Sequence, residues 1–257
     1  MTTLSDSEIS SEIRAQRLIH NADPNGAAGA CYELRMGNIY YDLTEAGKRF
    51  ALAPDETVLI KPGHRIVLIT AEELDIPADI LVRVVSKGSL FSVGLSPVAT
   101  YADPGFSGNL GIVTQNTSDK YIEIIQGEPI AKADFTRLGS AAAKPYRGQH
   151  GFQAGIWPLK AHLQKTHAEI LGDPRVLSEK DEALALLPAA TRTVIRRLET
   201  TQLWTSIALG LAVIINAGIL FSFSGRLAEG IYGVVINLIS SGILALLSIV
   251  GQIRRRI

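Results

Sequence analysis

The segment Ser86–Gly111 combines a small polar turn that can bind phosphate with an apolar stretch, an acidic turn and two glycines. Lys87 and Ser89 lie in a small polar turn, "SKGS", where a cation, hydroxyl groups and backbone N–H groups can bind phosphate oxygens. Asp103 follows in the acidic turn "ADPGFSG". Gly108 has no side chain and lets the backbone approach a ligand closely. The segment therefore predicts a pocket for a phosphorylated ligand, either catalytic or used for binding alone.

Four segments in chain order extend this pattern, and as a set they resemble a known family. They are "CYELRMG" (Cys31–Gly37), "SKGSLFSVGL" (Ser86–Leu95), "ADPGFSG" (Ala102–Gly108) and "KPYRGQHGF" (Lys144–Phe152), with "IQGEPIAK" between the last two. Over roughly residues 5 to 157 the set resembles the dCTP deaminase and dUTPase superfamily. The resemblance implies a distorted β-barrel that assembles as a homotrimer or higher oligomer, with each nucleotide site shared between neighbouring subunits.

The resemblance also implies roles for individual residues. Lys87 and Ser89 match the family's phosphate-contacting turn "RSSL", and Asp103 matches the water-activating Asp of dUTPases, in a turn that holds sugar and base. Glu33 stands where the pattern "DLRLG" has Asp, and Lys132 stands where "GxxIxQ" has Gln. The C-terminal motif resembles both "KYxxQxG" and "RGxGGF". The residues that it would fold over triphosphate and base are Tyr146, Arg147, Gln149 and Phe152.

Three positions depart from the deaminase pattern. Gly88 and Ser92 replace the catalytic Ser and the second Arg of the family's "RSSLARLGL" stretch. Val113 replaces the Glu that serves deaminases as general acid and base, five residues after the glycine of their "WSG". Because a valine cannot transfer a proton and attack of water on cytosine needs a positioned acid or base, we do not expect deamination.

Hydrolysis of a nucleoside triphosphate requires fewer groups. A dUTPase-type pyrophosphatase needs an Asp to orient water and a Mg²⁺-bound triphosphate, and Asp103 would serve as this catalytic residue. Lys132 and Gly88 weaken the match, and an Asp before Pro-Gly is often only a turn residue that caps its own backbone. Hydrolysis and binding without turnover therefore remain open.

Other classes of site and partner find little support in the sequence. The five histidines show no spacing typical of a metal site, so no protein-bound metal is expected. Lys plus Arg and Asp plus Glu each number 25, and a chain without net charge gives no indication of nucleic-acid binding. Cys31 is the single cysteine, which excludes an intrachain disulfide.

The elements that must position these residues are mostly strands. From Ala30 to about Leu138 short β-branched runs such as "TVLI", "RIVLIT" and "ILVRVV" alternate with turns rich in Gly, Pro, Asp and Asn, which predicts an all-β barrel or sandwich. Residues 1–20 are expected to be helical, with Ser5 as N-cap and Glu8 three residues later. Between residues 159 and 201 the pattern is helical again, and Ser178 is expected to cap one helix.

Two segments near the end of the chain have the length and composition of membrane spans. Leu203–Gly225 and Gly230–Ile253 contain no charged residue, and about 23 residues of helix reach roughly 34 Å, enough to cross a hydrocarbon core of about 30 Å. A buried helical hairpin in a soluble core is the alternative. No breaker separates "TRTVIRRLETTQLW" from the first span, which favours a stiff coupler over a solvated spacer.

Charge around the two spans predicts their orientation. Arginines precede the first span and follow the second, so both chain ends are expected in the cytoplasm and the protein in the inner membrane, as a multi-pass protein. The first 16 residues lack the apolar centre of a signal peptide. Asn216 and Asn237 are polar residues within the spans. They are incidental in a simple anchor but would line a pore in an oligomeric bundle.

Together these patterns predict three parts: a nucleotide-binding domain over residues 1–157, a helical stalk over 158–201 and a two-helix membrane module over 202–257. The first functional hypothesis is a nucleotide sensor coupled to a membrane effector, as in bacterial antiphage systems, with lipid bilayer and nucleotide as its partners. The alternative is a membrane-tethered dUTPase, dNTP pyrophosphatase or dCTP deaminase for nucleotide-pool control, which would use Mg²⁺ with the bound triphosphate.

Overall fold

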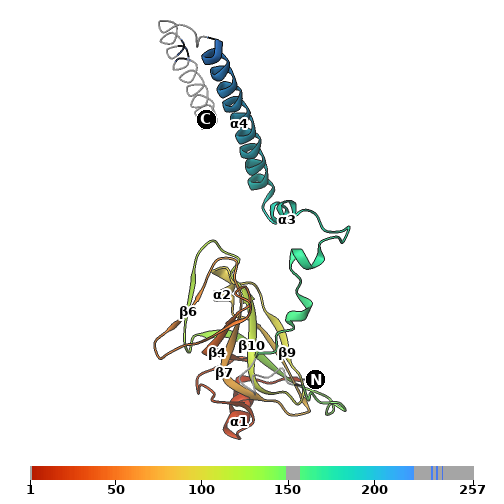
Figure 1. Ribbon diagram of the computed structural model, residues 1–257. Helices are drawn as coiled ribbons and strands as arrows, with labels where there is room; N and C mark the ends of the chain where they lie inside the picture. The colour runs from red at the N-terminus through yellow and green to blue at the C-terminus, as the bar shows by residue number, and fades with distance from the viewer. Residues whose placement is uncertain (1, 149–156, 223–232, 234–235, 237–238, 240–257) are drawn as a thin grey trace. The chain divides into compact units, whose positions relative to one another are not determined.

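A computed structural model describes residues 2–148, 157–222, 233, 236 and 239 of the chain (Figure 1). The chain divides into two compact units, Met1–Leu163 and Gln164–Ile257. The first unit contains the strands and the predicted nucleotide-binding residues. The second contains the helical segments, and each unit is described separately below.

The first unit is an antiparallel β structure, which confirms the expected mainly-β fold. Its strands are β1 (Thr2–Thr3), β2 (Leu18–His20), β3 (Ala27–Ala28), β4 (Cys31–Asp42), β5 (Lys48–Ala51), β6 (Thr57–Ile60), β7 (Arg65–Asp75), β8 (Ile80–Ser86), β9 (Ala99–Ala102), β10 (Ser107–Gln115), β11 (Ile122–Ile125) and β12 (Pro129–Arg137). The predicted runs "TVLI", "RIVLIT" and "ILVRVV" lie in β6, β7 and β8. The β-branched runs and their punctuating turns were therefore sufficient to locate the strands.

The main sheet follows the order β10-β7-β4-β12-β8-β9 and curls around one core (Figure 1). β1 pairs with β12, β2 with β7, and β3 and β5 with β4, while β6 and β11 form a separate ladder. The two edge strands of the path, β9 and β10, are consecutive in the chain. They are the strands that flank the predicted "ADPGFSG" turn.

The core is built from alternate residues of the strands, because successive side chains of a strand point to opposite faces. In β4, Tyr32, Leu34 and Met36 are buried, whereas Glu33 and Arg35 are turned to the other face. The same period places Ile112 inside and Val113 outside in β10. Alternation thus places Glu33, Arg35 and Val113 on the face of their strands away from the core.

The helix expected over residues 1–20 is shorter than predicted. Helix α1 spans Asp6–Arg14, with the Ser5 capping box confirmed, and strands β1 and β2 occupy its two flanks. Gln16 has a φ of +58°, which a right-handed helix cannot contain. Leu18 is fully buried but belongs to β2, where pairing with the edge of β7 replaces the expected helical turn.

A short helix, α2 (Gly88–Ser92), follows β8 and lies at the opposite end of the barrel from α1 (Figure 1). The predicted phosphate-contacting turn therefore forms the start of this helix. Lys87 is its N-cap residue and has an extended backbone.

The second unit contains helical segments in its described residues. They are η3 (His167–Ile170), α3 (Glu179–Ala185) and α4 (Ala189–Ser222), and η2 (Ala161–Leu163) ends the first unit. The Ser178 side chain accepts a hydrogen bond from the Asp181 backbone N–H, which confirms the expected N-cap of α3. Helix α4 is continuous across residues 201 and 202, in agreement with the lack of a breaker.

One segment of α4, Ala189–Asn216, is long and apolar enough to cross a membrane. Thirty-four residues of α-helix extend about 51 Å, so α4 exceeds a hydrocarbon core of about 30 Å and would project beyond it. The second predicted span, Gly230–Ile253, falls mostly outside the described residues. Two membrane-spanning helices are therefore a prediction of the sequence, of which the structure describes one apolar helix.

Candidate functional site

The two edge strands of the main sheet leave an opening between them. β9 is hydrogen-bonded to β8 and β10 to β7, and over the residues that the structure describes no ladder joins β9 to β10. A strand paired along one edge has N–H and C=O groups pointing away from its partner at every second residue. The facing edges of β9 and β10 therefore present backbone hydrogen-bonding groups to whatever enters between them.

A hollow of about 280 Å³ lies at this opening. The strands and their turn contribute Thr100, Tyr101, Asp103, Phe106, Leu110 and Gly111. Two residues from beyond the barrel, Tyr146 and Trp157, complete its wall. Its volume is close to the lower end of the range for small-molecule sites, about 300 Å³.

Asp103 lies exposed in the turn that joins β9 to β10. The Phe106 backbone N–H donates to the Asp103 backbone oxygen at 2.9 Å, and this bond closes the turn. No group among the described residues donates a hydrogen bond to the Asp103 carboxylate. The carboxylate is thus not used to cap its own turn, which was the alternative to a chemical role. Gly108 is buried beside it with a φ of +124°, a conformation that favours glycine.

The C-terminal motif reaches the same turn. The Tyr146 backbone N–H donates to the Pro104 oxygen at 2.7 Å, and the Tyr146 ring lies 6.0 Å from the Phe106 ring between centroids. A Cβ on Gly105 would lie 2.8 Å from Pro145 Cβ, so glycine is required for this approach. Tyr146 is therefore brought to the predicted pocket. Arg147 is exposed next to it, while Gln149 and Phe152 lie outside the described residues.

The predicted lysines form an ion cluster with Glu33. Lys87 Nζ lies 3.0 Å from Glu33 Oε2, and Lys132 Nζ lies 3.6 Å from Glu33 Oε1. The cross-strand pairing of Lys132 with Glu33 between β12 and β4 explains this contact. One carboxylate thus pairs with two ammonium groups. The net local charge is about +1, which can attract an anion.

Ser89 lies close in sequence to this cluster, and its side chain is exposed in α2. The Ser92 hydroxyl donates to the Ser89 backbone oxygen at 2.7 Å, so the residue in the position of the family's second Arg serves its own helix. In this turn Ser89 is therefore exposed, whereas Lys87 is partly buried in its ion pair with Glu33.

The structure does not bring all predicted residues together within one chain. Ala102, the residue before Asp103, pairs with Val82 near the start of β8. Lys87 instead follows Ser86, the last residue of β8. At about 3.3 Å per strand residue, the Asp103 turn and the lysine cluster are separated by roughly 15–20 Å. The predicted site therefore consists of two groups of residues near opposite ends of the β8–β9 ladder.

Val113 lies on β10, two residues after Gly111 and on the same face. Its side chain is 41% exposed, and its neighbour across the ladder is Val67. Position 113 is thus accessible from outside the core, but it presents no group able to accept or donate a proton.

A buried ion pair beside a second hollow was not predicted. Arg35 Nε lies 2.6 Å from Glu72 Oε1, the Arg35 backbone N–H donates to Glu72 Oε2 at 2.8 Å, and the Tyr32 hydroxyl donates to Oε1 at 3.3 Å. The hydrogen bond from Arg35 to Glu72 raises the pKa of the guanidinium, and burial raises the pKa of Tyr32 to about 12. No sequence signal links Arg35 to Glu72, because 37 positions separate them.

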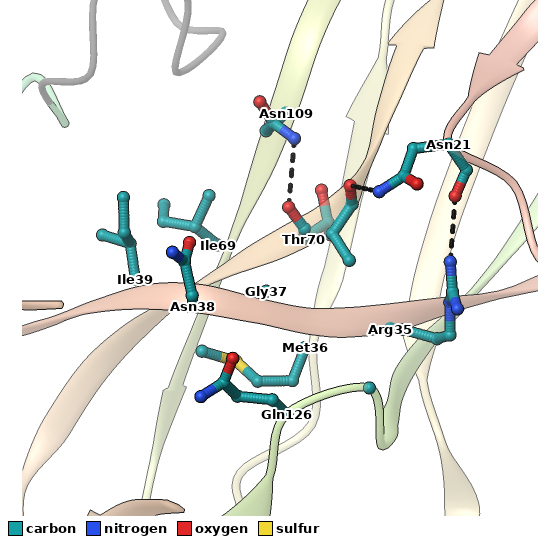
Figure 2. A pocket seen from close by; sticks show the side chains of 12 residues that line it. Asn21, Arg35, Met36, Gly37, Asn38, Ile39, Ile69, Thr70, Asn109 and Gln126 are labelled. Atoms are coloured by element: carbon teal, nitrogen blue, oxygen red, sulfur yellow. Dashed lines mark hydrogen bonds between the residues drawn. The ribbon is translucent and has the colours of Figure 1, made fainter. Parts of the chain in front are cut away.

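The hollow beside this pair has a volume of about 580 Å³ and is rich in amide side chains (Figure 2). These amides are Asn21, Asn38, Asn109 and Gln126. Asn109 Nδ2 donates to the backbone oxygens of Thr70 at 3.1 Å and Glu72 at 3.0 Å, which ties β10 to β7 where their register shifts. No predicted nucleotide-binding residue is among its described lining residues. The ion pair and Asn109 thus support the strand that lines the opening between β9 and β10.

His64 lies beside two carboxylates, which the spacing did not predict. The ligand atoms of Asp42, Glu45 and His64 lie within 4.8 Å of one another. His64 Nδ1 and Asp42 Oδ2 are hydrogen-bonded at 2.7 Å, and Lys61 forms an ion pair with Glu45. The hydrogen bond from Lys61 lowers the pKa of the Glu45 carboxyl. Within this group, His64 is paired with Asp42 and Glu45 with Lys61.

In α4, Asn216 Oδ1 is buried and has no hydrogen-bond partner among the described residues. An unpaired amide oxygen in an apolar helix favours contact with another polar group or water. Asn237, the second polar residue of the predicted membrane module, lies outside the described residues.

Comparison with known proteins connects the first unit to one family. Residues 3–138 match a family model described as dCTP deaminase-like. The chain is 29% identical over 139 residues to a dCTP deaminase of Pyrococcus furiosus, which covers 54% of this chain and 87% of that protein. It is 31% identical over 139 residues to a dUMP-forming dCTP deaminase of Beutenbergia cavernae, which covers 50% of this chain and 71% of that protein.

A solved structure is also similar. The crystal structure of a 2′-deoxycytidine 5′-triphosphate deaminase from Agrobacterium tumefaciens aligns with a TM-score of 0.46 and 16% sequence identity. The alignment covers 53% of this chain and 49% of that chain. The helical segment after residue 163 lies beyond the region that matches the family model.

Proposed function

The chain belongs to the dCTP deaminase-like family, and on this basis we propose that its first unit binds a deoxynucleotide without deaminating it. The observation that carries the proposal is the valine at position 113. Val113 stands on the accessible face of β10, where the family pattern has its general acid and base. Removing an amine from a pyrimidine by attack of water requires proton transfer, which a valine cannot provide.

The two groups of predicted residues suit different parts of a nucleotide. The opening between β9 and β10 offers aromatic and apolar walls and backbone hydrogen-bonding groups, which suit a base and sugar. The exposed Ser89 and the ammonium groups of Lys87 and Lys132 suit phosphate oxygens. Arg147, next to Tyr146, is a further cation for the phosphates.

The two groups lie roughly 15–20 Å apart in one chain, so a nucleotide bound by a single chain would reach both only in a fully extended form. In a ring of identical subunits, head-to-tail contacts can place one group of each subunit against the other group of its neighbour. A homotrimer with sites between subunits meets this requirement, and the proposal includes this assembly.

Binding and turnover of the full-length protein in detergent test the proposal. Each of dCTP, dUTP, dTTP, dATP and dGTP is added with Mg²⁺, binding is measured by calorimetry, and products are separated by chromatography. We expect binding of at least one pyrimidine nucleotide without release of ammonia, and about 10- to 150-fold weaker binding by Arg147→Ala, the usual effect of losing a hydrogen bond to a charged group. Release of ammonia from dCTP would contradict the proposal.

Val113→Glu provides a matched control for the chemistry. The substitution restores a carboxylate at the position of the family's Glu, but Gly88 and Ser92 still lack the other groups, and residues that act as a unit do not contribute additively. We therefore expect no ammonia from this variant either. Deamination by Val113→Glu alone would mean that the remainder of the deaminase site is intact.

A second candidate function is hydrolysis of the triphosphate to a monophosphate and pyrophosphate. The observation in its favour is the exposed Asp103 carboxylate, which no described residue engages. Mg²⁺ bound with the triphosphate would supply charge neutralisation, and a carboxylate in this position fits such an ion through oxygen ligands or an oriented water. Pyrophosphate release that Asp103→Asn abolishes, with nucleotide binding retained, would establish this function instead.

We further propose that α4 places the protein in the inner membrane and couples nucleotide binding to a membrane effector, with antiphage defence as its setting. The apolar segment Ala189–Asn216 and the unpaired Asn216 oxygen support this part of the proposal. Protein reconstituted into dye-loaded liposomes should release dye in response to one nucleotide. If the protein inserts but never permeabilises the membrane with any nucleotide, the helix serves only to tether a binding protein or an enzyme.

A further inference from the structure

A short segment beyond the barrel, residues 157–159, crosses the outer face of the main sheet, and we call it the strap. The Trp157 ring covers Gly111 so closely that a Cβ on this glycine would lie 2.1 Å from the ring. The Trp157 backbone N–H donates to the Tyr41 hydroxyl at 3.3 Å. Leu159 reaches the turn before β5, where a Cβ on Gly47 would lie 2.9 Å from its side chain. The strap therefore extends from β10 to the β4–β5 turn.

Apolar contacts hold the strap in place. Trp157 packs against a small cluster outside the main core, in which Tyr41, Val67 and Ile69 are buried. Ile39 and Leu43 pack against the same cluster. These side chains belong to the outward faces of β4 and β7 or to the turn after β4. The indole thus has a fixed position rather than a freely rotating one.

Trp157 also borders the hollow between β9 and β10. Trp157 is part of the wall of this hollow, together with Phe106, Tyr146 and Leu110. Asp103, a carboxylate, is the ionisable acid of the same wall. Aromatic and apolar side chains suit an uncharged ring, and the lysines that suit phosphate oxygens lie near the other end of the β8–β9 ladder. The ligand part that fits against Trp157 is therefore a base.

We propose that Trp157 is a base-binding residue, whose indole stacks on the base of the bound nucleotide. This inference rests on the proposed function, because it places the base of the same ligand. Every base has a π-face, and removal of one stacking aromatic residue weakens binding about 5- to 150-fold. Gly111 is glycine because the indole occupies the space that any other side chain would take.

The test uses the full-length protein in detergent with dUTP and dCTP as probes, each with Mg²⁺. The chain has two tryptophans, so Trp204→Phe leaves Trp157 as the single fluorophore. We expect a saturable change of its emission with the same midpoint as the calorimetric titration. Trp157→Ala should bind the preferred probe at least tenfold more weakly, whereas Trp157→Phe, which keeps an aromatic face, should recover most of the affinity.

Tyr121→Ala is the matched control, because Tyr121 is an aromatic residue that is 66% exposed and does not line the hollow. Its affinity should equal that of the wild type. Binding by Trp157→Ala that equals the wild type overturns the inference while leaving the proposed function intact. A wild-type protein that binds neither probe overturns the proposed function, and this inference with it.

Gly111→Ala separates displacement of the strap from a direct block of the hollow. The added methyl group collides with the indole, so this variant should lose affinity as Trp157→Ala does. In the Trp157→Ala background the methyl group meets no indole, and Gly111→Ala should then have no further effect, which a double-mutant cycle measures. Equal losses in both backgrounds would mean that the methyl group obstructs the ligand itself, and would overturn the assignment of Trp157.

Discussion

Replacement of Arg35 by methionine should strongly destabilise the barrel, because it leaves a buried carboxylate without its cation. Glu72 is fully buried, and the Arg35 guanidinium lies 2.6 Å away with 25% of its side chain exposed. Methionine keeps an apolar chain of similar reach and removes only the charged fork. The substitution therefore tests the contribution of the charge pair between β4 and β7 to stability, separately from the loss of apolar packing.

The magnitude follows from the contacts that remain. Removing one partner of a buried ion pair costs about 3–5 kcal/mol. The Arg35 backbone N–H and the Tyr32 hydroxyl still donate to Glu72, and the partial exposure of position 35 admits water, so we expect the lower end, about 3 kcal/mol. For a chain of this size such a loss corresponds to a decrease of about 6–12 °C in Tm.

The assay compares Arg35→Met with Arg83→Met, which breaks an ion pair of similar geometry on the surface of the same barrel. Arg83 lies 2.8 Å from Asp134, but its side chain is 60% exposed. Surface pairs contribute little because water and salt screen them, so Arg83→Met should leave Tm almost unchanged. Near-UV circular dichroism of the full-length protein in detergent follows the transition of both variants.

Equal shifts of Tm in the two variants would refute the reasoning. Such a result would mean that burial of Glu72 does not determine the contribution of the pair. A nucleotide titration of Arg35→Met at a temperature well below its Tm adds a second measurement. We expect weaker binding there, because the pair and Asn109 together fix the register of β10 against β7.

Three further predictions address charge and the membrane helix. Burial raises the pKa of Tyr32 to about 12 from an unfolded value of about 10, so its contribution to stability is complete below pH 10 and is lost as pH rises from about 10 to 12. Tyr32→Phe should lack this loss in unfolding curves, and an unchanged pH dependence would assign it to other groups. Glu33→Gln frees Lys87 and Lys132, and should tighten binding of inorganic triphosphate about three- to tenfold at low salt, with a steeper salt dependence in calorimetry; weaker binding would mean that Glu33 mainly positions the lysines. Asn216→Leu should insert into liposomes normally but abolish nucleotide-dependent dye release, whereas unaltered release would reduce the residue to part of an anchor.

Local sequence was sufficient for much of the barrel. The runs that form β6, β7 and β8 were predicted from β-branched composition and turn residues, and the caps at Ser5 and Ser178 from residue type and spacing. These signals depend on neighbours within a few positions, which the sequence displays directly. The prediction of a helix over residues 1–20 was wrong after Arg14, because a distant contact determines the structure there. Leu18 and Ile19 pair with Asp75 and Leu74 of β7, a contact more than 50 positions away that the local pattern does not show.

The residues of the candidate site were identified by type, but their grouping depended on topology. The order of the motifs along the chain gives no distance between Asp103 and Lys87, and the β8–β9 ladder separates them. Glu33 was noted as a departure from a pattern, yet its contacts with Lys132 and Lys87 result from the pairing of β12 with both β4 and β8. Pairing between distant strands is fixed by the register of the whole sheet.

The sequence by itself determined the class of the fold, the family and the residue types available for binding, because alternation, turns and motifs are local properties of the chain. Only the tertiary structure decided that β9 and β10 are open edges, that Glu72 is the partner of Arg35, and that Trp157 covers Gly111. Each of these facts joins residues far apart in sequence. Their contacts depend on how the curled sheet closes and where the chain returns across it, and no local pattern specifies either.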